Sequence, residues 1–135
     1  MSTVGGTSVV GEMGAAGAAS EASAGRAVTD ASFETAVLKS SRPVIVEYWA
    51  QWCGPCRMVA PVLESIAAEY AGQVELVTMN VDENPATAAR FGILHVPTIS
   101  VFADGQVVRQ VIGAKSRNAL LREFGDVLNA AADPS

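Results

Sequence analysis

Two apolar strands joined by a helix constrain the fold of this chain more than any other feature of its sequence. The run PVIVEYWA, residues 43–50, is rich in β-branched and aromatic residues, as is typical of a central strand covered on both faces. A helical stripe of apolar residues follows Cys53, and VELVTMN, residues 74–80, predicts the next strand. A strand, a crossover helix and a second strand indicate parallel pairing.

The segments around this unit predict further helices and a hairpin. TDASFETAVLKSS predicts a short helix with Thr29 or Asp30 as its N-cap, and NPATAARFG predicts another helix capped by Asn84. TISVFADGQVVRQVIG predicts an antiparallel hairpin around Asp104-Gly105, a dipeptide suited to a type I′ turn.

A last helix is expected to begin near Ser116, and a further edge strand is possible before the first helix. We therefore expect an α/β domain with a central mixed sheet of about five strands, flanked by about four helices.

Residues 1–25 are mostly Gly, Ala and Ser and contain no aromatic or basic residue. Such a segment buries too little apolar surface to offset its ordering entropy, so we expect a disordered tail followed by one domain over residues 26–132. Ala22-Ser23-Ala24 resembles a signal-peptidase site. However, a signal peptide also needs a cationic start and a continuous apolar stretch, and residues 1–25 have neither.

The charge balance narrows the range of partners. Nine basic and fourteen acidic residues give a formal charge of −5 at pH 7. Nucleic acids and anionic membranes both favour a basic protein surface, so we expect neither as a partner.

The two cysteines of the chain lie in WCGPC, at positions 53 and 56. Three interpretations are open: a structural disulfide, half of a metal site, or a redox pair. A zinc site normally needs four ligands, and the lone His95 with a carboxylate completes it poorly, so no metal is expected. A disulfide closing so short a loop adds little stability. We therefore favour the redox pair.

Thiol-disulfide exchange needs a thiolate that attacks and a second thiol that releases the mixed disulfide. Across a helix start, sulfurs at positions 53 and 56 can meet on one side. Gly54 permits the turn, and Pro55 lacks an N–H that would have no partner there. Cys53 then faces the free N–H groups of the first helical turn, which stabilise negative charge, whereas Cys56 is more sheltered and keeps its proton longer.

WAQWCGPCRMVAP, the later HVPT and GA segments and the element order together resemble the thioredoxin family over about residues 27–130. The resemblance implies a thioredoxin fold and a protein-disulfide reductase with Cys53 as nucleophile and Cys56 as resolving thiol. It also implies recharging by a flavin-dependent thioredoxin reductase that uses NADPH, while this chain itself holds no cofactor. We expect a cytoplasmic monomer that acts on disulfide-containing client proteins.

The resemblance extends to the surroundings of the cysteines. It implies that Trp52 is an exposed surface tryptophan and that Pro97 follows a cis peptide bond. The Val96 backbone would then lie open beside Cys53 and pair with an extended client strand. An apolar groove is expected there, framed by Gly92, Val96 and Gly113.

Glu47 is an unusual carboxylate inside an apolar strand. If it is buried, its pKa rises, which suits a group that takes a proton from Cys56. The family usually has Asp here and a lysine nearby, at the position we match to Met79, so we expect the pKa of Glu47 to be raised mainly by desolvation. Strand alternation also permits a solvent-facing Glu47.

His95 is a second departure from the family, which often has a small residue there. It can contact a client or titrate near the groove, but a tolerated loop residue is the interpretation that we favour. One rival function also stays open, a non-catalytic subunit that binds another protein through the groove beside Cys53. An oxidant or isomerase is disfavoured because such relatives tend to carry His between the cysteines, where this chain has Gly54-Pro55.

Overall fold

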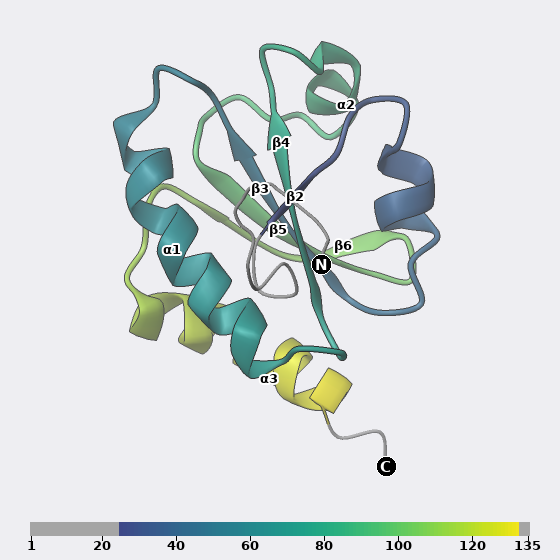
Figure 1. The fold of residues 1–135 in the computed structure, drawn as a ribbon, viewed down its shortest axis with the longest axis vertical. Coiled ribbons are helices and arrows are strands. Elements are labelled where there is room, and N and C mark those ends of the chain that lie inside the picture. The colour runs from purple at the N-terminus through teal and green to yellow at the C-terminus, as the bar shows by residue number, and fades with distance from the viewer. Residues whose placement is uncertain (1–24, 133–135) are drawn as a thin grey trace, which may run out of the picture.

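The computed structural model describes residues 25–132, which form a five-stranded sheet with helices on both faces (Figure 1). Apart from Gly25, the expected tail of residues 1–25 lies outside the described residues. The elements in chain order are β2 (Arg26–Ala27), η2 (Glu34–Leu38), β3 (Val44–Trp49), α1 (Gly54–Glu69), β4 (Glu75–Asn80), α2 (Pro85–Arg90), β5 (Thr98–Ala103), β6 (Gln106–Ile112) and α3 (Arg117–Ala132).

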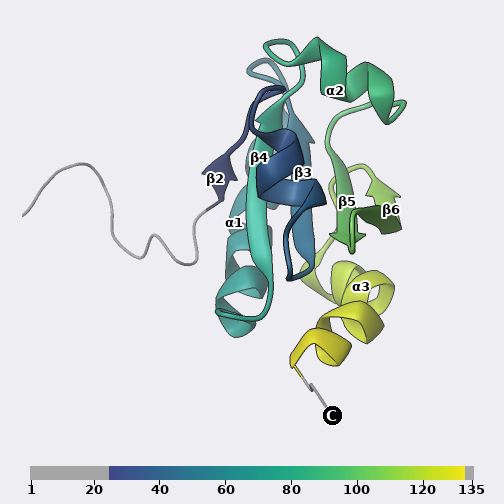
Figure 2. The ribbon, with the colours of Figure 1, turned by 90° about the vertical axis from the view of Figure 1, so that its right-hand side faces the viewer.

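The strands lie in the order β2-β4-β3-β5-β6, which Figure 2 shows from left to right. β3 pairs in parallel with β4, and β5 pairs antiparallel with both β3 and β6. The mixed sheet predicted from the sequence is therefore confirmed. The hairpin between β5 and β6 turns at Asp104 and Gly105, which have φ values of 53° and 78°, as a type I′ turn requires.

Alternate residues of β3 face two separate cores, because successive side chains of a strand point to opposite faces. Ile45 packs on the face that α1 and α3 cover, whereas Val44, Val46 and Tyr48 pack on the face that η2 covers. α1 and α3 bury the apolar stripes that their sequences predict, with Val59, Leu63 and Ile66 from α1 and Leu120, Phe124 and Leu128 from α3.

The second core is closed by three phenylalanines. Phe33 precedes η2, Phe91 follows α2 and Phe102 lies in β5, and their ring centroids are 5.3–5.6 Å apart. The T-shaped contacts of Phe102 with the other two rings are a favoured aromatic geometry. The cluster therefore joins three segments that are distant in the sequence.

The first helix differs from its prediction. It is a single π-helical turn over Glu34–Leu38, and neither Thr29 nor Asp30 caps it. Asp30 instead accepts hydrogen bonds from the N–H groups of Ala86 and Thr87 in the first turn of α2, at 3.2 and 2.8 Å. Asn84 precedes α2 as predicted, but its side chain accepts from the Asp30 N–H at 2.8 Å rather than from the N–H groups of α2.

None of the helices within residues 25–132 combines the length and the apolar character that crossing a membrane requires.

Candidate active site

The two cysteines lie where β3 passes into α1. Cys53 is the N-cap residue of α1, Cys56 lies in its first turn, and the two form a disulfide with their Cα atoms 5.4 Å apart. The Cys53 sulfur accepts a hydrogen bond from the Cys56 N–H at 3.2 Å. The Cys53 sulfur therefore lies at the positive end of the α1 dipole, a position that stabilises a thiolate when the pair is reduced.

Both cysteines are buried in the disulfide form, with 3% of Cys53 and 2% of Cys56 exposed. The sequence led us to expect that Cys56 is the more sheltered, but exposure does not distinguish the two in this state. They pack with Ala50, Trp49 and Val96, so apolar atoms surround the sulfurs. Gly54 and Pro55 are exposed at the start of the helix.

The Val96–Pro97 peptide bond is cis, as the resemblance implied, and Pro97 is buried. Val96 packs against the cysteine pair and also lines a groove of about 430 Å³. The groove is lined by Trp52, Val81, Asp82, Ile93, Leu94, His95 and Val96. Gly92 and Gly113, which we expected to frame it, are absent from this lining, and the Gly113 N–H instead donates to the Pro97 carbonyl oxygen at 2.8 Å.

Glu47 is buried in β3, with 3% of its surface exposed, so the alternative of a solvent-facing side chain is wrong. It lines a cavity of about 230 Å³ together with Trp49, Cys56, Arg57, Ala60 and Thr78. The structure thus brings Glu47 and Cys56 to the same small cavity. Burial, and to a lesser degree the negative charge of Glu64, raises the pKa of Glu47 to about 7.

Met79 is not the residue beside Glu47. The parallel register pairs Glu47 with Thr78, whereas Met79 pairs with Tyr48 and lies in the core on the opposite face of the sheet. Our match was therefore wrong by one residue, which in a strand reverses the face. The expectation that no lysine compensates the carboxylate still holds at this position, because Thr78 is uncharged.

Comparison with known proteins identifies the family. The family model named Thioredoxin matches residues 25–125. The chain belongs to the thioredoxin family. A thioredoxin of Streptomyces clavuligerus is 55% identical over 95 residues, which are 70% of this chain and 88% of that protein. A thioredoxin of Mycobacterium tuberculosis is 54% identical over 109 residues, which are 81% of this chain and 94% of that protein.

A further relative has two functions in its name. A bifunctional thioredoxin reductase/thioredoxin of Mycobacterium leprae is 50% identical over 101 residues, which are 75% of this chain and 22% of that protein. With the family established, the chain is a thiol-disulfide oxidoreductase that reduces protein disulfides, and its five-stranded mixed sheet with flanking helices is the thioredoxin fold that the resemblance implied.

Asp82 is a site residue that the sequence analysis did not identify. The indole N–H of Trp52 donates to its Oδ2 at 2.8 Å, which fixes the orientation of a side chain that is 70% exposed. The predicted parallel pairing of the two strands could have indicated that Trp52 and Asp82 lie close together. β3 and β4 are parallel, so the residues after their carboxyl ends, Trp52 and Asp82, lie at the same edge of the sheet.

Leu94 and Arg57 were also missed. Leu94 is 85% exposed and stands in the same groove as Trp52. Arg57, the residue after Cys56, donates from its guanidinium to the carbonyl oxygens of Gln51 and Cys53. These hydrogen bonds connect the first turn of α1 to the loop that contains Trp52.

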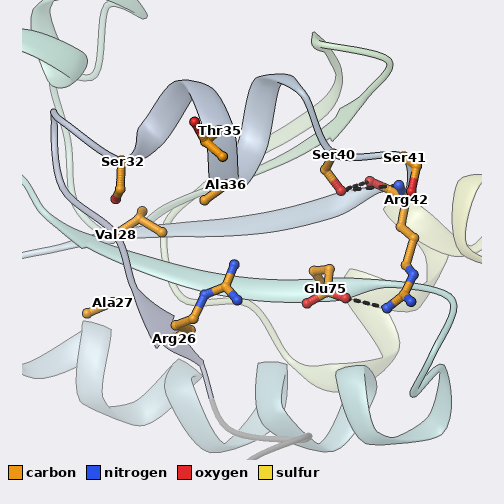
Figure 3. A pocket seen from close by; sticks show the side chains of 10 residues that line it. All are labelled: Arg26, Ala27, Val28, Ser32, Thr35, Ala36, Ser40, Ser41, Arg42 and Glu75. Carbon is orange, nitrogen blue, oxygen red and sulfur yellow. Dashed lines mark hydrogen bonds and ion pairs between the residues drawn. The ribbon is translucent and has the colours of Figure 1, made fainter.

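Figure 3 shows another hollow, of about 620 Å³, beside β2, η2 and the start of β4. Arg26 and Arg42 reach into it, and Arg42 is paired with Glu75 at 2.6 Å. None of its lining residues belongs to the disulfide, the groove or the Glu47 cavity. It therefore forms no part of the redox site.

Proposed function

We propose that this protein reduces disulfides of client proteins by exchange at Cys53 and Cys56, and that a thioredoxin reductase restores the dithiol with electrons from NADPH. The observation that supports the exchange most directly is the Cys53 sulfur at the N-terminus of α1, within bonding distance of Cys56. The Mycobacterium leprae relative, whose name joins the reductase and thioredoxin activities in one chain, supports the choice of reductase. We place the reaction in the cytoplasm, where thiols are kept reduced.

The reaction begins with the Cys53 thiolate. It attacks one sulfur of the client disulfide, a mixed disulfide forms, and the other client sulfur leaves as a thiolate. Cys56 then loses its proton and attacks the Cys53 sulfur, which forms the Cys53–Cys56 disulfide and releases the second client thiolate. Two electrons pass to the client, whose thiolates take up protons. The short distance between the cysteines makes the second step intramolecular, and therefore fast.

Glu47 is the group that we propose as the acceptor of the Cys56 proton. The two side chains line one cavity, and a pKa near 7 lets the carboxylate take up or return a proton at neutral pH. The cavity is large enough for water, so transfer can pass through a bridging molecule.

Client recognition is proposed at the groove beside Cys53. The Val96 backbone offers hydrogen bonds to an extended client segment, while Pro97 holds the loop and Trp52 provides apolar contact. His95 lies exposed in the same groove and is available to contact the client.

The test is insulin reduction driven by NADPH and thioredoxin reductase. We expect turnover in the parent chain and its loss, by at least about a hundredfold, in Cys53→Ser.

Glu47→Gln should slow the reaction near pH 7 by about tenfold, within the range of general-base effects. Glu34→Gln, which removes an exposed carboxylate of η2, is the matched control and should leave the rate unchanged. If Cys53→Ser kept the parent rate, the exchange mechanism would be wrong.

A further inference from the structure

We propose that the cavity beside Glu47 is a binding site for a primary ammonium group on a short alkyl stem, with the Glu47 carboxylate as its counter-ion. The binding site depends only on the cavity and its lining. The inhibition of exchange that binding should cause rests on the proposed function of Glu47.

Glu47 is a buried acidic side chain without a cationic partner. Only 3% of it is exposed, and none of the four ion pairs found within residues 25–132 involves it. The paired positions on the neighbouring strands are Thr78 of β4 and Ile99 of β5, and both are uncharged. An unpaired buried carboxylate is costly to ionise, and a cation that reaches it offsets part of this cost through Coulomb attraction and charge-assisted hydrogen bonds. The carboxylate therefore favours a cationic ligand over a neutral one.

The cavity gives such a ligand a route to the carboxylate. Its lining consists of Glu47, Trp49, Cys56, Arg57, Ala60 and Thr78. Glu47 and Cys56 are buried whereas Arg57 is exposed, so the cavity leads from the surface to the carboxyl group. Its volume of about 230 Å³ is below the roughly 300–1,000 Å³ of pockets for drug-sized molecules, which restricts the occupant to a small molecule or a single side chain.

The uncharged part of the lining suits a short alkyl stem. Trp49 and Ala60 present apolar atoms, and the face of an indole ring also attracts cations. The hydroxyl group of Thr78 can accept a hydrogen bond from one of the N–H groups of an ammonium ion. The cavity therefore combines an anion, a hydroxyl acceptor and apolar walls, which together complement an alkylammonium ion.

Helix α1 carries the charged and titratable groups that neighbour Glu47. The guanidinium of Arg57 donates to backbone carbonyl oxygens rather than to Glu47, and Cys56 is held in the disulfide. Burial, and after it the negative charge of the exposed Glu64, raises the pKa of Glu47 to about 7. An alkylammonium ion stays charged well above this pH. Binding should therefore strengthen as the pH rises through 7 and Glu47 ionises.

The direct test is a ¹H–¹⁵N NMR titration of the full chain, in its disulfide form at pH 8, with n-butylammonium chloride. We expect saturable shifts of the amide signals of Glu47, Trp49 and Thr78, with a dissociation constant of about 1–10 mM, as is typical of so small a ligand. n-Butanol, a neutral molecule of similar shape, should bind at least about tenfold more weakly. n-Butylammonium itself should bind at least about tenfold more weakly at pH 5, where Glu47 is protonated.

Two variants and a matched control locate the bound cation. Glu47→Gln removes the counter-ion and should abolish binding, and Thr78→Lys should abolish it by filling the cavity with an ammonium group of the chain itself. Glu34→Gln, which removes an exposed carboxylate of η2 and changes the net charge as Glu47→Gln does, should leave the dissociation constant unchanged. The proposal is overturned if the parent shows no saturable shift, if binding persists in Glu47→Gln, or if n-butanol binds equally well.

The ammonium group can belong to a free alkylamine or to a lysine side chain of a bound protein, because both present the same chemistry. Nα-acetyl-lysine methylamide distinguishes these sources, since its backbone must stay outside the cavity. Equal affinity for this compound and for n-butylammonium would support the site and show that its opening admits a lysine side chain. Binding of n-butylammonium alone would support the site as one for free amines.

A second readout links occupation of the cavity to exchange. A bound ammonium ion fills the space between Glu47 and Cys56, so n-butylammonium should slow insulin reduction driven by dithiothreitol, half-maximally at its dissociation constant. The residual rate of Glu47→Gln should not respond to the amine. Equal inhibition of the parent and Glu47→Gln would overturn the inhibitory role. The NMR titration needs no exchange activity, so it supports or rejects the binding site even if the proposed function fails.

Discussion

Glu47 lies in the middle of β3, where both neighbouring strands present uncharged side chains. Burial of a carboxylate without a cation opposes its ionisation, so the group titrates near neutral pH rather than near 4.5. The same burial that prepares Glu47 to accept a proton must therefore reduce the stability of the folded protein when the group is ionised.

The free energy of unfolding should therefore depend on pH through the ionisation of Glu47. The pKa of Glu47 is about 7 in the folded protein, above its ordinary value of 4.5. The contribution of Glu47 to the free energy of unfolding is therefore fully present below pH 4.5 and is lost as the pH rises through 7. We expect Glu47→Gln to be more stable than the parent by up to about 3 kcal/mol at pH 8, with the gain shrinking toward pH 4.5. Urea unfolding of the disulfide form across this range measures the difference. The Glu34→Gln control should show no such trend, and a gain independent of pH would contradict this account.

At the scale of elements, a reciprocal pair of side chains fixes where α2 begins. Asp30 caps α2 from the segment before η2, and Asn84, the residue before α2, accepts from the Asp30 backbone. Sequence patterns assign a capping residue to the helix that follows it, so Asp30 was assigned to the wrong helix. Only the folded chain brings residues 54 positions apart into contact.

Asp30→Ala should therefore destabilise the first turn of α2 rather than η2. We expect a lower unfolding temperature, with faster amide hydrogen exchange concentrated in the first turn of α2, because Ala86 and Thr87 lose their acceptor. Hydrogen bonding to the side chain of Thr87, and to a lesser degree to the N–H groups of Thr87 and Ala86, lowers the pKa of Asp30 from its ordinary value of 3.8, so the difference from the parent should persist above pH 3.8 and fade below it. Glu34→Ala, which removes an exposed carboxylate of η2, is the control. Faster exchange confined to η2 would contradict the capping role.

For the molecule as a whole, the sequence predicted those features that depend on local pattern. The parallel β3–β4 pair, the type I′ hairpin and the burial of Glu47 follow from periodicity, turn chemistry and strand apolarity. Features that depend on register or on converging loops were missed. Met79 was placed on the wrong face by a shift of one residue, and the pairing of Trp52 with Asp82 requires knowing that two strands end at one edge.

The central claim is that Cys53 attacks the client and Cys56 resolves the mixed disulfide. Cys56→Ser tests it most directly, because this variant keeps the sulfur at the α1 N-terminus and removes only the resolving thiol. Mixing the reduced variant with a disulfide-containing protein, followed by mass spectrometry under non-reducing conditions, should show a stable one-to-one adduct through Cys53, whereas reduced Cys53→Ser should form little. Absence of the adduct, or equal adduct formation through Cys56 in Cys53→Ser, would contradict the account.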